Sequence, residues 1–372
     1  MLAWKAGIGR ERKLCDGTVA GLVRAYQVDR ASPYHELKWN TRRTYDELLD
    51  KVVKAIGGGN PCRDRHVDLR RWHDAAKWPK VEAGAERVDR AHKFINIIRR
   101  LCGYGVAAEI PECGRLAGIL DEMRYKQAER RRVKLELDHA EAFADKAIEM
   151  GRLSLAIGTM VQFETGMRQR EVIGEWRPLA KDEPRTGIVL NKLRWQRGLT
   201  WADLSRDLII QKATTKTGAI ISHDLKLMPS VMKVLEMVPM EKRVGPLIID
   251  EDAGRPYANH AYAREWRLVA RAAGIPDHVW NSDSRAGAIT EAEDAGAELD
   301  LIRGAVGHTQ LSTTARYSRG AIGKSRKIAE LRQAHRAAKN MSETQVEERD
   351  RERWGTCRSA VGRLNLCHAI EI

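Results

Sequence analysis

The stretch GHTQLSTTARY, residues 307–317, places His308 nine residues before Tyr317. Three further basic residues lie upstream, in the order Arg168, Lys216, Arg285. An isolated tyrosine hydroxyl titrates at about pH 10, so a tyrosine that attacks phosphate at neutral pH needs cationic neighbours to stabilise charge and share protons. The ordered set therefore indicates phosphodiester chemistry with a tyrosine nucleophile.

The composition is that of a basic globular protein. The 372 residues include 65 lysines and arginines against 51 acidic residues, which gives a formal net charge of +14 and an isoelectric point near 9.6. Such an excess can neutralise a polyanionic backbone, so it agrees with a nucleic-acid partner without establishing one. The length suffices for two domains of ordinary size.

Signals for membrane insertion, secretion or zinc binding are lacking in the sequence. The opening residues, MLAWKAGIGRERK, have no continuous apolar core, and no run approaches the roughly 20 apolar residues of a membrane helix. The six cysteines form no CxxC pair, so we expect reduced thiols and no metal site. These patterns predict a cytoplasmic protein.

Helical periodicity organises the first third of the chain. Apolar residues repeat at helical spacing in four segments, at 19–26, 45–56, 88–101 and 116–123. Glycines follow the second and third segments, as is common where helices end. The first 125 residues therefore indicate a small all-helical domain.

Basic residues on this domain and just after it are candidates for DNA contact. Arg42 and Arg43 lie on exposed helix faces, where they either meet phosphates or are merely solvated. The segment RYKQAERRRVK is densely positive with few apolar anchors, and it contributes Arg130, Arg131 and Arg132. It suits a linker that follows a phosphate backbone, and a solvated helix end is the alternative.

Arg168 lies in ETGMRQREV, where Gly166 interrupts a helical pattern and a new helix is expected to begin. Glu171 follows three positions later, close enough on one helix face for its carboxylate to orient the guanidinium. Taken alone, the two residues have the pattern of an ordinary surface ion pair.

A β-hairpin is expected in DLIIQKATTKTGAIISHDL, because β-branched runs flank TTKTG. Lys216 lies at its tip. A cation there either reaches a leaving oxygen or is only a solvated turn residue. Lys212 and Lys226 are nearby competitors for the same role.

Two helices separated by Gly296 are expected in NSDSRAGAITEAEDAGAELDLIRGAVGH, with Arg285 at the start of the first. The acidic residues of TEAED are spread around a helix, which predicts a solvated face rather than a metal site. His308 follows the second helix. From its position alone, Tyr317 would be expected to pack in the core with its hydroxyl at the rim. Only the whole ordered set favours a role for Tyr317 as a nucleophile.

Taken together, these segments resemble the tyrosine recombinases, specifically the integrases of phages and mobile elements, over residues 17–330. ETGMRQREV resembles the first arginine box of that family, TTKTG its hairpin lysine, SDSRAGAITEAEDAGAEL its second arginine box and GHTQLSTTARY its histidine-to-tyrosine box. The helical part, with GTVAGLVRAY and KWNTRRTYDELLDKVVKAIG, is similar to the core-binding domain, which forms half of a clamp around DNA.

The resemblance implies a role for each residue of the set. Tyr317 would attack the scissile phosphate and become joined to the DNA 3′ end, releasing a 5′ hydroxyl. Arg168 and Arg285 would hold the nonbridging oxygens, where charge develops in the transition state. Lys216 would protonate the departing 5′ oxygen, and His308 would donate to a phosphate oxygen. No metal, nucleotide or other cofactor is implied.

Two further positions belong to the implied site. Glu171 would support the first arginine. Ser282 departs from the pattern, because the family usually has histidine or another basic residue three places before the second arginine. Serine can hydrogen-bond a phosphate but cannot act as an acid or base at neutral pH. The sequence therefore leaves open an active enzyme, a slow one, and a catalytically impaired DNA-binding relative.

The implied fold class is mainly α with a small β-hairpin or sheet (α+β), a helical core-binding domain being followed by a catalytic domain. The expected segments are an N-terminal tail (1–16), the helical domain (17–125), a basic linker (126–137), the catalytic domain (138–335) and a C-terminal tail (336–372). The tail would either dock on a neighbouring protomer or remain disordered.

Double-stranded DNA with attachment sites is the implied partner, bound by a homotetramer with host DNA-bending accessory proteins. Two other classes stay open. A type IB topoisomerase would use the same nucleophile chemistry but relax supercoils as a monomer. A non-catalytic helical RNA binder would leave the four ordered motifs to chance.

Overall fold

The chain forms two compact units that divide between Arg131 and Arg132. This boundary falls within the segment 126–137. A computed structural model describes residues 15–59, 64–78, 86–318, 328–334 and 336–337. The two tails expected from the sequence therefore lie almost entirely outside the described residues, and so do both alternatives for the second tail, docking and disorder.

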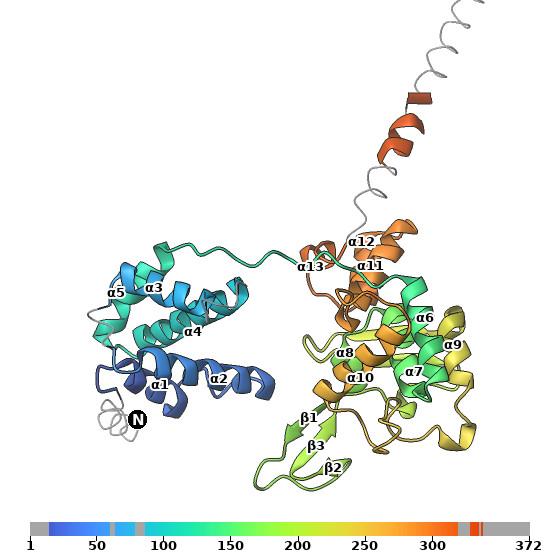
Figure 1. The fold of residues 1–372 in the computed structure, drawn as a ribbon, viewed down its shortest axis with the longest axis horizontal. Coiled ribbons are helices and arrows are strands. Elements are labelled where there is room, and N and C mark those ends of the chain that lie inside the picture. Colours follow the sequence, from blue (N-terminus) through green and yellow to red (C-terminus); the bar gives the residue numbers. More distant parts are fainter. Residues whose placement is uncertain (1–14, 60–63, 79–85, 319–327, 335, 338–372) are drawn as a thin grey trace, which may run out of the picture. The chain divides into compact units, whose positions relative to one another are not determined.

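The described part of the first unit is all helical (Figure 1). Its helices are α1 (Val19–Val28), α2 (Trp39–Ile56), α3 (His66–Lys77), α4 (Val88–Ala107) and α5 (Pro111–Glu122). Four of them match the predicted periodic segments. The fifth, α3, was not predicted because its apolar stripe is thin: its buried residues are Leu69, His73 and Ala76, and one of these is a histidine.

Helix α4 supplies much of the core of this unit. Its residues Ile95, Ile97, Ile98 and Leu101 are almost completely buried, and α1, α2, α3 and α5 all pack against it. Among the described residues, Cys15, Cys102 and Cys113 form no disulfide. Apolar burial of this kind is the main stabilising contribution in a helical domain of this size.

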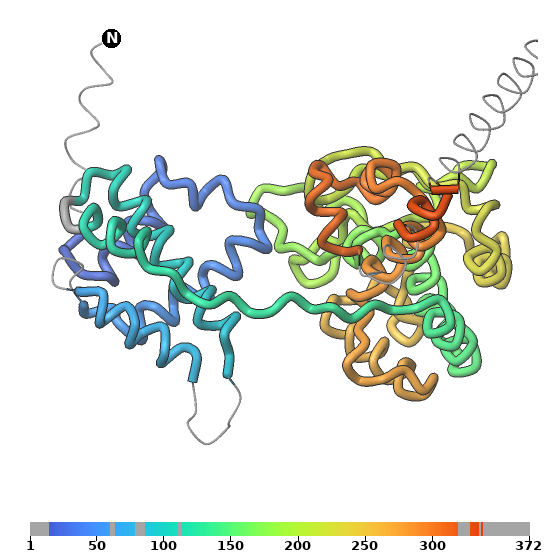
Figure 2. The backbone as a smooth tube through the Cα atoms, turned by 90° about the horizontal axis from the view of Figure 1, so that it is seen from above, coloured from blue at the N-terminus to red at the C-terminus, as the bar shows by residue number. Residues whose placement is uncertain are grey.

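Between α5 and α6 the backbone is extended, without a helix (Figure 2). The alternative of a solvated helix end for this basic segment is therefore wrong. Tyr125 anchors its start, because the phenol ring packs on His73 with centroids 4.6 Å apart. Leu135 anchors its end in the second unit: the leucine is fully buried, and its carbonyl oxygen would lie 1.9 Å from a Cβ on Gly287. Only glycine permits this approach.

The second unit combines helices with short antiparallel strands. Its α-helices are α6 (Leu137–Glu149), α7 (Leu153–Thr165), α8 (Gln169–Ile173), α9 (Pro229–Glu236), α10 (Asn259–Ala272), α11 (Ser284–Asp294), α12 (Leu299–Ala305) and α13 (Leu311–Ala315). Its strands are β1 (Glu175–Pro178), β2 (Val189–Leu190), β3 (Leu193–Gln196), β4 (Ile209–Ala213) and β5 (Ile220–Asp224). Short 3-10 helices include η2 (Trp201–Asp203), η3 (Leu225–Leu227), η4 (Met240–Lys242) and η5 (Asn281–Asp283).

Helix α7 is central in this unit and is buried almost along its whole length. It packs against α6, α9 and α11. In the same core Phe143 stacks on Trp266 at 5.0 Å, and the indole of Trp266 donates a hydrogen bond to Thr159 Oγ1. The mainly helical α+β fold class expected from the sequence is confirmed.

Strands β4 and β5 form the predicted hairpin, in which Ile209 pairs with Asp224 and Ala213 with Ile220. A second sheet, in the order β1, β3, β2, was not predicted. Its strands have four residues or fewer, so they carry too little alternation to be read from the sequence. In Figure 1 this sheet lies at the opposite end of the unit from α12 and α13.

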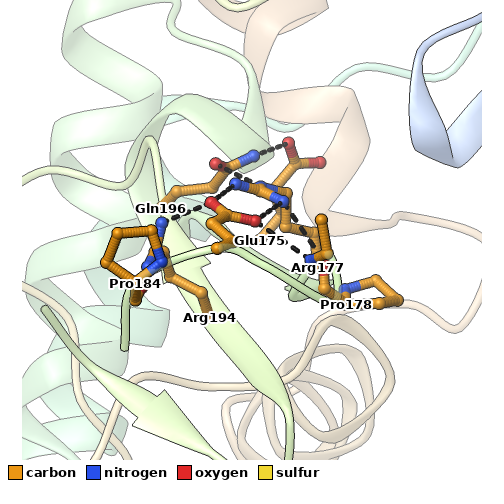
Figure 3. A network of polar contacts seen from close by, with 8 residues as sticks. Glu175, Arg177, Pro178, Pro184, Arg194 and Gln196 are labelled. Atoms are coloured by element: carbon orange, nitrogen blue, oxygen red, sulfur yellow. Dashed lines mark hydrogen bonds and ion pairs between the residues drawn. The ribbon is translucent and has the colours of Figure 1, made fainter. Parts of the chain in front are cut away.

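A network of polar side chains holds this three-stranded sheet (Figure 3). The Glu183 carboxylate accepts hydrogen bonds from both Arg177 and Arg194. Arg177 Nε also donates to Gln196 Oε1 at 2.9 Å, and Gln196 Nε2 donates to Glu175 Oε1 at 3.2 Å. Side-chain pairing of this kind compensates for strands that have few backbone hydrogen bonds.

Candidate active site

Half-buried Arg168 pairs with the buried Glu171 where α7 passes into α8. Helix α7 ends at Thr165, and Arg168 is the residue that caps the start of α8. Glu171 accepts from the Arg168 backbone N–H at 2.9 Å and from Arg168 Nη1 at 3.0 Å. Its carboxylate has no exposed surface, so the interpretation as a surface pair is wrong. A buried carboxylate fixes the guanidinium far more firmly than an exposed one.

The same carboxylate contacts the hairpin that carries Lys216. The backbone N–H of Thr215 donates to Glu171 Oε1 at 3.2 Å. Lys216 is exposed on the turn between β4 and β5, and its charge is one of the causes that lower the pKa of His308. The effect of a charge on a pKa weakens with distance, so this effect indicates that the Lys216 ammonium group lies near the His308 imidazole.

The two competing lysines are placed differently. Lys212 Nζ donates to the Gly198 carbonyl at 2.7 Å and pairs with Asp203 at 3.1 Å. Lys226 is exposed in η3, beyond the end of β5. Of the three lysines, only Lys216 is among the charges that act on His308.

Arg285 is the most deeply buried cation of the predicted set, with 3% of its surface exposed. Its Nη1 donates to the Gly166 carbonyl at 2.5 Å and its Nη2 to the Val306 carbonyl at 2.7 Å. Its Nε has no hydrogen-bond partner among the described residues. Burial and the nearby charge of Arg168 lower the pKa of Arg285 to about 10, so it remains charged at neutral pH.

His308 is held against the hairpin by a close backbone approach. Gly307 has a φ of +66°, and a Cβ at this position would lie 2.7 Å from Thr214 Cγ2. The imidazole is 5% exposed, its Nδ1 lies 3.0 Å from Thr314 Oγ1, and its Nε2 has no partner among the described residues. Burial, followed by the charges of Arg285, Arg168 and Lys216, lowers the pKa of His308 to about 4. The ring is therefore neutral at pH 7.

Tyr317 lies directly against these two groups. Its ring stacks on that of His308, with centroids 5.4 Å apart and an interplanar angle of 18°. The Arg285 guanidinium carbon is 5.8 Å from the centroid of the same ring. The Tyr317 carbonyl accepts from Thr290 Oγ1 at 3.3 Å, and its N–H donates to the Thr314 carbonyl at 2.9 Å. The tyrosine thus lies beside the histidine and the second arginine.

Ser282 is exposed on the 3-10 helix η5, which leads into the helix that carries Arg285. The neighbouring Asp283 is buried, and its carboxylate accepts from the Trp280 backbone N–H at 2.9 Å. The fold at this point is therefore held by the flanking residues, while Ser282 itself faces outward.

The candidate DNA-binding arginines lie outside this cluster. Arg42 is half-buried in the first unit, where it donates to the His35 carbonyl at 2.6 Å, and Arg43 is exposed with its guanidinium carbon 5.2 Å from the Trp39 ring centroid. In the extended segment, Arg130 and Arg132 are exposed and Arg131 is half-buried.

Metal and membrane features were also sought in the part of the chain that the structure describes. There, no group of three or more His, Cys, Asp or Glu side chains is arranged to hold a metal ion. The same residues include no helix that is long and apolar enough to span a membrane.

The structure thus brings Arg168, Glu171, Arg285, His308 and Tyr317 together, with Lys216 at the edge of the cluster. Sequence reasoning missed Thr314, which contacts the histidine ring and the backbone of Tyr317. Its position inside GHTQLSTTARY was the available signal, but a threonine between two candidate residues carries no chemical signature of its own.

Comparison with known proteins identifies the fold. The sequence matches no family model and no curated protein. A solved lambda integrase dimer bound to a COC′ core site has a TM-score of 0.62 and 14% identity, covering 82% of this chain and 78% of that chain. A Tn1549 transposon integrase in complex with circular intermediate DNA has a TM-score of 0.57 and 14% identity, with coverages of 84% and 99%.

A lambda integrase tetramer bound to a Holliday junction is similar as well, with a TM-score of 0.60, 12% identity, and coverages of 83% and 80%. At these identities the likeness establishes the fold. The resemblance to the integrases that the four motifs indicated is therefore confirmed at the level of the fold.

Proposed function

We propose that the chain is a site-specific DNA recombinase that cleaves and rejoins DNA through Tyr317. The Tyr317 hydroxyl releases its proton to water, its oxygen forms a bond to the scissile phosphorus, and the bond from phosphorus to the 5′ oxygen breaks. The products are a 3′-phosphotyrosyl linkage and a 5′ hydroxyl. Each phosphodiester is replaced by another ester, so a 5′ hydroxyl from a second strand can reverse the step without ATP.

One observation carries this proposal: a buried guanidinium that pairs with no carboxylate of the described residues and a neutral imidazole both lie against the ring of Tyr317. Arg285 bonds only backbone carbonyls, and its Nε is unpaired among the described residues. Buried donors normally have partners, and positive charge in such a place favours an anion. A phosphate beside Tyr317 would supply both the acceptor oxygens and the charge.

Each of the remaining groups is proposed to have its own role at that phosphate. Arg168, oriented by Glu171, and Arg285 hold the nonbridging oxygens, where charge develops in the transition state. His308 donates a hydrogen bond to a phosphate oxygen. Lys216, on an exposed hairpin turn, protonates the departing 5′ oxygen. These roles combine positioned cations with one proton donor, which suits the transfer of a phosphoryl group between oxygens.

The proposal requires a movement of Tyr317. The Arg285 Nε and His308 Nε2 atoms are buried, and the ring of Tyr317 lies against both side chains. A phosphate reaches these donors when the ring moves off the imidazole. Tyr317 follows the five-residue helix α13 and is only half-buried, so such a shift disturbs little of the core.

Double-stranded DNA is the proposed substrate, bound as a tetramer on two duplexes. The solved structures with the same fold include DNA complexes of a dimer and of a tetramer. Arg42, Arg43 and the arginines at 130–132 are proposed to contact phosphates, and host DNA-bending proteins are proposed as accessory factors. Phosphate contacts of this kind make binding strongly salt-dependent.

A second candidate, a DNA-binding relative with impaired cleavage, is favoured by Ser282. The tyrosine proton must leave during attack, and neither a serine nor an imidazole with a pKa near 4 is an effective base at neutral pH. The same protein would then occupy its DNA site without breaking strands.

A trapping experiment tests the proposal. Duplexes bound by the Tyr317→Phe variant are first selected from a random pool, which gives the target sequence without relying on cleavage. Duplexes of that sequence are then nicked at successive positions, so that a short 5′-hydroxyl fragment diffuses away after cleavage. We expect a covalent protein–DNA product that survives denaturation with wild-type protein and is absent with Tyr317→Phe.

The possible results separate the candidates. An adduct that persists in Tyr317→Phe would show that another residue is the nucleophile. An adduct formed by Ser282→His but not by wild-type protein would favour the impaired relative. Relaxation of supercoiled DNA by monomers, without recombinant product, would favour a topoisomerase.

A further inference from the structure

We propose that Thr314 is a positioning residue whose hydroxyl holds the proton of His308 on Nε2, so that the imidazole presents an N–H group to the phosphate. The inference rests on the proposed function for the identity of the acceptor. The hydrogen bond itself is a property of the protein without DNA, which allows the two to be tested separately.

The side-chain hydroxyl of Thr314 contacts the ring of His308. Thr314 has no exposed surface, and its Oγ1 lies 3.0 Å from His308 Nδ1. Among the described residues this is the hydrogen bond found for the hydroxyl. The carbonyl of the same residue accepts from the Tyr317 N–H at 2.9 Å. Thr314 therefore contacts both the ring of the histidine and the backbone of the nucleophile.

The position of the proton follows from hydrogen-bond accounting. A neutral imidazole has one N–H group and one acceptor nitrogen, and a hydroxyl has a single hydrogen to donate. If Nδ1 carried the proton, the threonine hydrogen would be buried without an acceptor, which is unfavourable. If the hydroxyl donates to Nδ1, both groups are satisfied and the proton lies on Nε2.

Nε2 is the atom that the site needs as a donor. It is buried without a partner among the described residues. Arg285 on α11, Arg168 before α8 and Lys216 on the hairpin place positive charge around the ring, and Tyr317 stacks on it. Burial, together with these charges, keeps the ring neutral, so the tautomer, rather than the charge, decides whether the nitrogen donates or accepts.

The hydroxyl can be removed without changing the size of the side chain. Thr314→Val replaces it by a methyl group, and Thr314→Ser keeps it. Thr313→Val is a matched control, because it makes the same change one position earlier on α13, at a half-buried residue. Tautomers are read from the nitrogen chemical shifts of uniformly ¹⁵N-histidine-labelled protein without DNA, with His308 assigned by comparison with His308→Gln.

We expect the proton on Nε2 in the wild-type protein and in Thr314→Ser. On the nicked duplex, Thr314→Val should cleave about tenfold more slowly at neutral pH, which is the scale of one lost hydrogen bond. Its affinity for the intact duplex should be unchanged. Thr314→Ser and Thr313→Val should cleave as the wild type does.

A wild-type spectrum with the proton on Nδ1 would overturn the inference, whatever the variants do. So would undiminished cleavage by folded Thr314→Val. If wild-type protein gives no adduct at all, the proposed function fails, while the spectrum still decides where the proton lies. If Thr314→Val does not fold, the wild-type and Thr314→Ser spectra carry the test.

Discussion

Two arginine clusters in the second unit show how a closed ion network differs from a cationic site. In the three-stranded sheet, Arg177 and Arg194 share the carboxylate of Glu183, and this pairing raises the pKa of Arg177. In the candidate site, Arg285 forms no ion pair with a carboxylate of the described residues, and burial with the charge of Arg168 lowers its pKa to about 10. The two arginine pKa values are displaced in opposite directions.

The comparison shows which feature distinguishes a site that favours an anion from a closed ion network. An unpaired nitrogen alone is not that feature, because Arg194 Nε in the sheet network is also buried without a partner among the described residues. What separates the clusters is the balance of charge around the guanidinium. A network with carboxylates is complete by itself, whereas the cluster around Arg285 favours the arrival of an anion.

The largest expected effect is on cleavage, and it follows from changing the arginine of the candidate site. Arg285→Lys keeps a positive charge, but a lysine cannot donate to two carbonyls and a phosphate in one fixed plane. We expect adduct formation on the nicked duplex to slow by roughly 10²- to 10³-fold, as for the loss of one preorganised donor.

The control for this change is Arg177→Lys in the sheet network. It should lower the midpoint of thermal unfolding, measured by circular dichroism, and leave the cleavage rate unchanged. Equal losses of cleavage in the two variants would mean that the clusters do not differ in the way their charges indicate.

The second prediction concerns stability and pH. The pKa of His308 is about 4 in the folded protein, against an ordinary value of 6.5. As the pH falls below 6.5, the unfolded chain takes up a proton that the folded chain does not, so stability is lost until the pH passes the folded pKa. At about pH 4.5 this group should cost roughly 2–3 kcal/mol of unfolding free energy relative to neutral pH.

Urea unfolding at neutral pH and at about pH 4.5 measures this cost, and His308→Gln should lose that part of the pH dependence. The comparison between the two proteins removes the contribution of the carboxylates, which titrate in both. A pH dependence that is the same in His308→Gln would show that the imidazole is not held neutral by its surroundings.

The smallest expected effect is on the pKa of His308, and it follows from changing Lys216 at the edge of the site. Lys216→Gln removes one of the positive charges that disfavour protonation of His308, so the pKa of His308 should rise towards its ordinary value. Titration of the labelled histidine by NMR measures the change. Lys226→Gln changes an exposed lysine outside the cluster and should leave the pKa of His308 unaltered. An equal rise of this pKa in the two variants would place Lys216 no closer to His308 than Lys226.

Much of the fold could be predicted wherever a local pattern was strong. The β-branched runs beside TTKTG predicted the hairpin, and the apolar spacing of residues 88–101 predicted α4. The three-stranded sheet was missed because its strands have four residues or fewer, too short to show an alternating pattern. The burial of Glu171 was missed because spacing shows that two side chains can meet, but not whether water reaches them.

By itself, the sequence determined the kinds and order of the reactive residues, the helices with strong periodicity, and the departure at Ser282. Only the tertiary structure decided that Arg285 bonds the Gly166 carbonyl, 119 positions away along the chain, and that it pairs with no carboxylate in the part of the chain that the structure describes. It likewise decided that Tyr317 stacks on His308 and that Thr314 Oγ1 lies within hydrogen-bond distance of His308 Nδ1. The physical reason is that periodicity reports which face of one segment is buried, whereas partners, charge balance and the proton on a ring nitrogen depend on segments that meet only when the chain has folded.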